Sequence, residues 1–298
     1  MTDNLLARYQ ADLSLKDLAE RTIYTNTKNT QNYLAWLDNQ GLDPLTVDPR
    51  LYLKILRDRD LTPASIRVIF SHLSTFYDYS EREKLIQKNP IPRIQKTYLS
   101  EYKKAEKIRK AISVEQAAEL VHLTTRTRDR AILLLLLKTG IRRHELVTLD
   151  VNSLDFDSQS LTLKETHKRS NRIVFLDDET IRALRRWLNI RETWPKKDGE
   201  KALFLNNWGL RLADNSIDNI ARKAVERVNK AGRVGQINFS PHIARYCMTT
   251  WLLDAEMPVR YIKWLRGDAI KEAYEIYDTV RPEDVKKSYL ENVPQFGV

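Results

Sequence analysis

The clearest pattern of hydrophobic and polar positions lies in the segment 62–77. Apolar side chains recur there three, four and seven positions apart, at Ile66, Ile69, Phe70, Leu73, Phe76 and Tyr77. This spacing is typical of a helix that buries one face. Thr62 and Pro63 precede it, as a capping residue and a proline at the first helical position. We interpret the aromatic side chains as core packing rather than as a surface that stacks on DNA.

The rest of the first third of the chain also indicates helices. Residues 24–37 place apolar side chains at helical spacing, and Gly41 ends that pattern. A further helix is expected over residues 49–57. The segment 89–92, Asn-Pro-Ile-Pro, then interrupts the helical pattern. Together these elements predict a helical N-terminal domain over residues 1–96.

A second domain is predicted to begin near residue 113. Ser113 followed by Gln116 is the capping-box signature of a new helix. The stretch 97–112 before it carries many basic residues and is interpreted as a linker. We therefore expect the second domain to span residues 113–298.

Within the second domain, the helical spacing of apolar residues is interrupted once by a strand-like segment. Residues 161–164 and 172–176 have the composition of two short strands, and the residues between them are all polar. This predicts a hairpin with Lys168 at its tip. Helices resume from Asp178. The predicted fold class is mainly α, with a small antiparallel sheet in the C-terminal domain.

The charge of the chain favours a polyanionic partner. The 298 residues carry a net charge of +10, and the isoelectric point is near 9.5. Between Arg82 and Lys110, ten basic residues face three acidic ones, which gives that stretch a net charge of +7. A concentrated basic stretch is better explained by a phosphate backbone than by solubility.

Other classes of protein fit the sequence less well. The longest strongly apolar run, residues 131–137, is far shorter than the ~20 residues of a membrane-spanning helix, and the N-terminus has no signal pattern. Cys247 is the only cysteine, so no intrachain disulfide is expected, and we expect a cytoplasmic protein. The five histidines have no zinc-type spacing, and there is no nucleotide-binding loop, so no metal or cofactor is expected.

Four local features contain residue types that act on phosphates, and each is weak when taken alone. They are Arg142 in the segment Thr139–Leu146, Lys168 on the hairpin, the pair His242 and Arg245 after Ser240-Pro241, and Tyr277. The serine and proline predict a helix start, so the His–Arg pair would share one helix face near the positive end of the helix dipole. Tyr277 is one of thirteen tyrosines.

The order and spacing of these features resemble the tyrosine recombinase (lambda-type integrase) family. The family pattern has an arginine in T-G-[LI]-R-x-x-E-L, a lysine on a β-hairpin, H-x-x-R on a helix, L-x-G-[HW], and a tyrosine about nine residues later. Residues 139–146, 242–245 and 265–268 match the three boxes, and Tyr277 lies nine residues after Asp268. Residues 61–92 resemble the helical, SAM-like core-binding domain of the family.

The sequence departs from the family pattern at Asp268, where the family usually has histidine or tryptophan. A carboxylate accepts hydrogen bonds and does not donate them. We therefore expect Asp268 to orient an arginine or a lysine, with Trp264 as an alternative source of the missing donor. Tyr246 also replaces a histidine that is common after the second arginine. These departures suggest a divergent branch, one that resembles integrases of archaeal plasmids and viruses.

The hairpin lysine is a further departure, because the usual flanking glycines are absent. Counting back from Val174, the family lysine falls on His167 or Lys168. We choose Lys168, with Lys164 as the rival.

The resemblance implies a reaction and a role for each residue. Arg142 and Arg245 would hold the phosphate, and His242 would accept the tyrosine proton or donate a hydrogen bond to the phosphate. Lys168 would protonate the leaving 5′ oxygen. Tyr277 would be the nucleophile that forms a covalent phosphotyrosine.

The resemblance also implies a double-stranded DNA substrate and a tetramer on two DNA sites, with each C-terminal tail packed on a neighbour. A monomer or dimer in free solution is compatible with this. The tail has Val285, Tyr289 and Leu290 at helical spacing, which fits docking on a neighbour and packing on its own domain equally well. Tyr274 is the second candidate for the nucleophile.

Three other functions stay open at this point. A regulator of the same fold that has lost catalysis is favoured by Asp268. A type IB topoisomerase would share the chemistry without a preferred sequence. A metal-dependent nuclease or DDE-type transposase would need carboxylates gathered around Mg²⁺, and no such spacing stands out.

Overall fold

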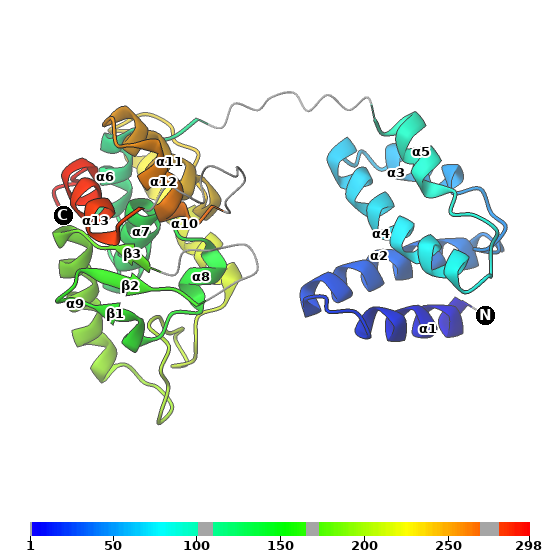
Figure 1. Cartoon of the computed structure of the whole chain (residues 1–298), viewed down its shortest axis with the longest axis horizontal. Helices are drawn as coiled ribbons and strands as arrows, with labels where there is room; N and C mark the ends of the chain where they lie inside the picture. Colours follow the sequence, from blue (N-terminus) through cyan, green and yellow to red (C-terminus); the bar gives the residue numbers. More distant parts are fainter. Residues whose placement is uncertain (1, 101–109, 165–172, 269–279) are drawn as a thin grey trace. The chain divides into compact units, whose positions relative to one another are not determined.

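The computed structural model describes residues 2–100, 110–164, 173–268 and 280–298. The chain divides into two compact units, an N-terminal unit of residues 1–107 and a C-terminal unit of residues 108–298 (Figure 1). The described residues are mostly helical and include one small sheet, as predicted. Among the described helices, none is long and apolar enough to cross a membrane.

The N-terminal unit is a bundle of helices around α4. The five helices described there are α1 Thr2–Ser14, α2 Glu20–Asn39, α3 Arg50–Asp58, α4 Pro63–Arg82 and α5 Ile91–Tyr98. The helix α4 begins at Pro63, and the hydroxyl of Thr62 accepts the Ser65 N–H at 3.2 Å, so the predicted cap is confirmed. The aromatic stripe of α4 is buried in the core of this unit, which confirms its interpretation as packing.

The prediction that residues 89–92 end the helical pattern was wrong in part, because α5 starts inside that segment. Asn89 Oδ1 accepts the N–H of Ile91 at 2.9 Å and so satisfies the start of the helix. Pro92 lies in the first turn, where no intrahelical partner for its nitrogen is needed. The helix reaches Tyr98, so the first residues of the predicted linker are helical.

The C-terminal unit places helices around α7 and the sheet. Its described elements are α6 Val114–His122, α7 Thr127–Thr139, α8 Arg143–Val147, the 3₁₀ turn Val151–Ser153, β1 Leu154–Asp155, β2 Ser160–Thr162, β3 Ile173–Phe175, α9 Asp178–Thr193, α10 Asp214–Ala231, α11 Pro241–Asp254, α12 Val259–Arg266 and α13 Pro282–Asn292. The capping box of Ser113 and Gln116 is formed at the start of α6, as predicted.

The sheet is antiparallel with the strand order β1-β2-β3. Leu161 pairs with Val174, so the two predicted strands form the predicted hairpin pairing. The strand β1 was missed in the sequence, because two residues are too few to show a periodic pattern.

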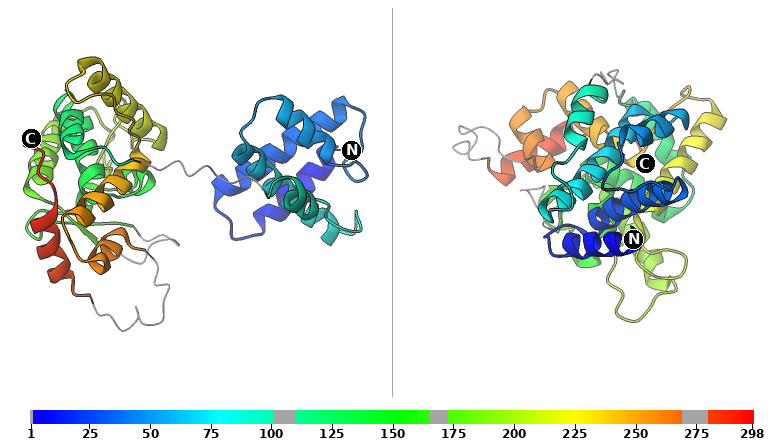
Figure 2. Two further views of the ribbon diagram at one scale, coloured as in Figure 1. Left: turned by 90° about the horizontal axis from the view of Figure 1, so that it is seen from above. Right: turned by 90° about the vertical axis from the view of Figure 1, so that its right-hand side faces the viewer.

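The helix α7 is the centre of this unit. Its leucine run is fully buried, which is the pattern of a helix covered on all sides. The helices α6, α9 and α11 pack against it. The helix α13 lies beside α12 (Figures 1 and 2), and its Val285 and Tyr289 are buried in a cluster with Phe175 of β3 and Leu252 of α11. The tail helix therefore packs on its own unit in this structure.

Candidate active site

The turn between α7 and α8 presents Arg142. Gly140 ends α7 with a φ of 61°, in the left-handed region that favours glycine. A Cβ at Gly140 would lie 2.5 Å from Met248 Cε and 3.4 Å from Arg245 Cα. The glycine thus allows both the sharp turn and the close approach of α11.

A buried carboxylate holds Arg142 in place. Glu145 Oε2 accepts the backbone N–H of Arg142 at 2.7 Å, and Oε1 accepts from Nη1 of the same arginine at 3.1 Å. The Glu145 side chain is 3% exposed and the Arg142 side chain 39%. The Arg142 guanidinium group is therefore held by the buried Glu145 carboxylate and remains accessible to solvent.

Arg245, in the box 242–245, makes hydrogen bonds to residues of the other two boxes, 139–146 and 265–268. Its Nη1 donates to the Gly140 carbonyl at 3.2 Å, and its Nη2 donates to the Arg266 carbonyl at 2.6 Å and to Asp268 Oδ1 at 3.2 Å. The side chain is 13% exposed. The structure thus brings Arg245 to the Arg142 turn and to Asp268, and the expectation that Asp268 orients an arginine is confirmed.

His242 lies in the first turn of α11 and is exposed to solvent. The helix begins at Pro241 with Ser240 at its N-cap position, as predicted, although the Ser240 side chain makes no capping hydrogen bond. His242 and Arg245 are three residues apart on this helix. They share the end of α11 that faces the Arg142 turn, because the Gly140 carbonyl binds Arg245.

Trp264 packs between helix and sheet. Its ring stacks on Phe175 of β3, with centroids 5.8 Å apart and planes at 5°. This contact attaches α12 to the sheet. One face of the Trp264 ring is therefore used for packing.

Of the two candidates for the hairpin lysine, the structure describes Lys164 but not Lys168. Lys164 follows β2, and its Nζ lies 3.3 Å from Asp150 Oδ2. Lys168 and His167 lie outside the described residues, as do both candidate nucleophiles, Tyr277 and Tyr274.

Sequence reasoning missed Arg211, which organises the loop after α8. Its Nη1 donates to the carbonyls of Val147 and Leu149, each at 2.9 Å, and its Nη2 binds Asp150. Asp150 thus binds both Arg211 and Lys164. No motif marks Arg211, because its partners lie more than sixty positions earlier in the chain.

Asp150→Asn is expected to lower the free energy of unfolding by about 1–2 kcal/mol at pH 7, because Arg211 and Lys164 lose a charged acceptor. The hydrogen bond from Arg211, followed by that from Lys164, holds the pKa of Asp150 below its ordinary value. The stabilisation is thus present above the unfolded-state pKa and disappears as the pH falls through the lowered folded-state pKa. Urea unfolding between pH 7 and pH 3 measures it.

Asp157→Asn is the matched control, since Asp157 is exposed on the turn after β1. An Asp150→Asn variant whose deficit is the same at pH 3 as at pH 7 would contradict the ion-pair explanation.

A second buried network was also missed. Lys138 is fully buried, and its Nζ donates to Asp177 Oδ2 and Glu179 Oε2, each at 2.7 Å, and to the carbonyl of Pro294. Glu179 also accepts the backbone N–H groups of residues 296–298 at 2.6–3.1 Å. The only sequence signal was a lysine next to an apolar run. This network fixes the end of the chain to α7 and α9.

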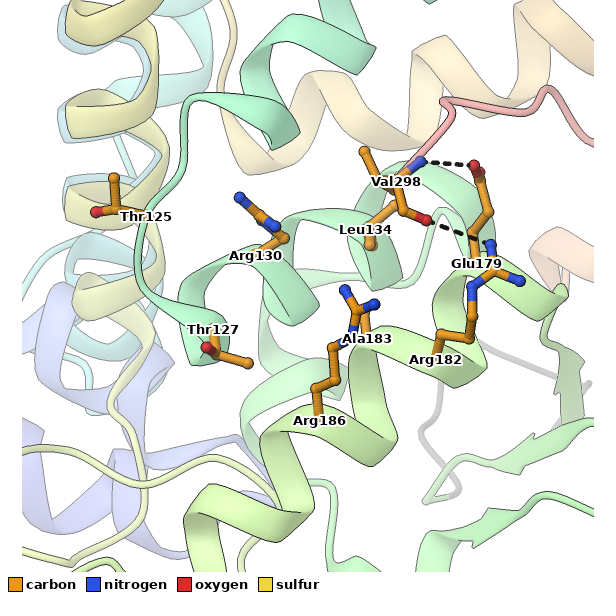
Figure 3. Close-up of a pocket in the computed structure, with 9 residues that line it drawn as sticks. All are labelled: Thr125, Thr127, Arg130, Leu134, Glu179, Arg182, Ala183, Arg186 and Val298. Carbon is orange, nitrogen blue, oxygen red and sulfur yellow. Dashed lines mark hydrogen bonds between the residues drawn. The ribbon is translucent and has the colours of Figure 1, made fainter.

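A pocket of about 130 Å³ lies beside this network, between α7 and α9. Figure 3 shows Arg130, Arg182 and Arg186 around Val298, with Glu179 and Arg182 bound to the backbone of Val298. Of the predicted site residues that the structure describes, Arg142, His242, Arg245 and Asp268, none lines this pocket.

The comparison with protein families decides where the chain belongs. Residues 110–283 match the model described as "Phage integrase family". This is more than half of the chain, and it includes all the predicted site residues. The chain belongs to the phage integrase family.

Full-length relatives agree with the family assignment. Tyrosine recombinase XerC of Pelotomaculum thermopropionicum is 29% identical over 272 residues, which cover 87% of this chain and 85% of the relative. Tyrosine recombinase XerA of Pyrococcus horikoshii is 22% identical over 97% of this chain and 93% of the relative.

Solved structures of integrases share the fold. The Tn1549 transposon integrase in complex with circular intermediate DNA has a TM-score of 0.68 at 16% identity, over 96% of this chain and 98% of that one. A lambda integrase dimer bound to a core site has a TM-score of 0.66 at 13% identity, over 97% of this chain and 95% of that one.

Proposed function

We propose that the chain is a site-specific DNA recombinase that cuts and rejoins strands through a 3′-phosphotyrosyl intermediate. The observation that carries this proposal is the position of Arg245, which is bonded both to the turn of Arg142 and to Asp268. The Arg245 side chain thus contacts the turn that presents Arg142, and planar guanidinium groups suit the oxygens of a phosphate.

The proposed roles follow from the chemistry of a phosphodiester. The Tyr277 oxygen attacks phosphorus, the bond from phosphorus to the 5′ oxygen breaks, and Lys168 gives that oxygen a proton. Arg142 and Arg245 stabilise the added charge on the non-bridging oxygens, and His242 accepts the tyrosine proton or donates to the phosphate. The phosphotyrosine conserves the bond, so a 5′ hydroxyl from another strand reverses the step without added energy.

Lys168 is preferred to Lys164 as the acid. Lys164 is paired with Asp150 at the base of the hairpin, which supports a structural role for it. Asp268 acts by holding Arg245.

Double-stranded DNA is the proposed substrate, and the place of action is the cytoplasm. The net charge of +10 supports a polyanionic partner, and the Tn1549 and lambda integrase structures contain DNA. We assign DNA clamping to residues 1–96, a basic linker to residues 97–112 and the chemistry to residues 113–298. A tetramer on two DNA sites is the proposed assembly.

A second candidate function is DNA binding without cleavage. Asp268 favours it, because an acceptor stands where a donor is expected. The intact contacts of Arg142 and Arg245 favour cleavage instead, since a regulator has no need to keep both arginines anchored.

Cleavage mapping tests the proposal. The protein is incubated with a library of randomised duplexes, denatured, and the DNA that stays covalently attached is sequenced. We expect 3′-linked adducts at a preferred sequence. Cleavage without sequence preference, together with relaxation of supercoils, would indicate a topoisomerase. Salt-sensitive binding with no adduct would indicate the regulator.

A further inference from the structure

Arg266, the last residue of α12, is attached to Arg245 through two contacts. Its carbonyl accepts from Arg245 Nη2 at 2.6 Å. Its Nε lies 3.0 Å from Asp268 Oδ2, while Oδ1 of the same carboxylate accepts from Arg245 at 3.2 Å. One carboxylate thus places the guanidinium groups of two arginines side by side. The Arg266 side chain is 35% exposed and that of Arg245 is 13% exposed.

The net charge of Arg245, Asp268 and Arg266 shows why Arg266 is needed for phosphate binding. Asp268 carries a negative charge close to the position proposed for the phosphate, and like charges repel. Arg245 and Asp268 alone sum to zero. With Arg266 the group carries a net charge of +1, so the attraction for a phosphate is restored.

The donors of Arg245 are largely committed within the protein. An arginine has five N–H donors, and three are used in the contacts with Gly140, Arg266 and Asp268. At most two remain for a phosphate. The terminal amino groups of Arg266, by contrast, make no hydrogen bond with any residue in the described ranges.

We propose that Arg266 is a further catalytic residue, whose guanidinium group donates to a non-bridging oxygen of the scissile phosphate. It supplies the donor that Asp268 lacks, and Asp268 positions it against Arg245. Trp264, the other candidate for this donor, packs its ring on Phe175. The inference rests on the proposed function, because it requires that the chain cleaves DNA beside Arg245.

The test compares two nicked suicide duplexes that carry the mapped cleavage sequence. One has a normal scissile phosphate, and the other has a methylphosphonate, in which a methyl group replaces one non-bridging oxygen and its charge. Arg266→Ala is expected to slow adduct formation by about 10–100-fold on the phosphate, but by less than about threefold on the methylphosphonate, where there is less charge to stabilise. Arg266→Lys, which keeps the charge but loses the planar fork, is expected to fall between wild type and Arg266→Ala on the phosphate.

Arg186→Ala is the control, because it removes an exposed guanidinium group from the pocket between α7 and α9. It is expected to match wild type on both duplexes.

Wild-type rates for Arg266→Ala on the phosphate would overturn the inference. An equal slowing on both duplexes would also overturn it, because it would mean that Arg266 only supports α12. If Arg266→Ala does not fold, as thermal unfolding would reveal, Arg266→Gln replaces it. Absence of any adduct with the wild-type protein would count against the proposed function itself.

Discussion

Replacing Tyr277 by phenylalanine is expected to abolish covalent attachment to DNA. The substitution removes one oxygen atom, and that oxygen is the proposed nucleophile. The loss should reach at least about 10⁴-fold, because the other groups of the site have no nucleophile to activate. Duplex affinity should stay within about threefold of wild type, since most of the binding energy comes from contacts to the DNA backbone. Adducts on a nicked suicide duplex, resolved on denaturing gels, measure the effect.

Tyr274→Phe is the matched control, because it makes the same chemical change three residues earlier. It is expected to form adducts at a rate close to wild type. The opposite pattern, with adducts in Tyr277→Phe and none in Tyr274→Phe, would move the nucleophile to Tyr274. Mixing Tyr277→Phe with an Arg245→Ala protein tests whether the tyrosine acts within its own subunit. Recovery of adducts in that mixture would indicate donation between subunits.

Lys138→Met is expected to lower the free energy of unfolding by about 3–5 kcal/mol, because it leaves Asp177 and Glu179 buried without their cation. The Lys138 side chain is fully enclosed, and its ammonium group also lies 4.4 Å from the centre of the Phe296 ring. Urea unfolding at pH 7 measures the loss. Arg222→Ala, which breaks an exposed pair with Glu226, is the control and should cost no more than about 1 kcal/mol.

The pH dependence of the stability lost in Lys138→Met distinguishes the loss of the ion pairs with Asp177 and Glu179 from the loss of packing. Burial raises the pKa of Glu179, but the Lys138 ion pair and the backbone N–H groups of Phe296 and Val298 together lower it below the ordinary value. The stabilisation from Glu179 is therefore present above its unfolded-state pKa and is lost as the pH falls through the lowered folded-state pKa. The deficit of Lys138→Met should shrink over that range. A deficit that stays constant in acid would mean that lost packing is the cause.

Adding Asp177→Asn and Glu179→Gln to Lys138→Met should recover part of the lost stability, because no buried charge is then left alone. A triple variant less stable than the single one would show that the hydrogen bonds to residues 296–298 contribute more than the charge balance.

Much of the local structure followed from the sequence by itself, because it depends on neighbours within one helical turn. The starts of α4 and α11, and the turn at Gly140, need only a proline or glycine and the residues beside it. The pairing of β2 with β3 followed from their strand-like composition and from the polar residues between them in the sequence. The order and spacing of the motif boxes were enough to predict the family, and residues 110–283 match its model.

Tertiary structure alone decided which residues support the site. Arg245 lies 105 positions from Gly140 and 23 from Asp268, and only the packing of α11 against α7 and α12 brings these groups within hydrogen-bond distance. The burial of Lys138 likewise depends on residues 156 positions away. Hydrophobic periodicity reports which face of a helix is buried, but it does not report which helix covers that face. For that reason the pattern of α13 fitted two partners equally well, and the packing of Val285 and Tyr289 on their own unit became clear only in three dimensions.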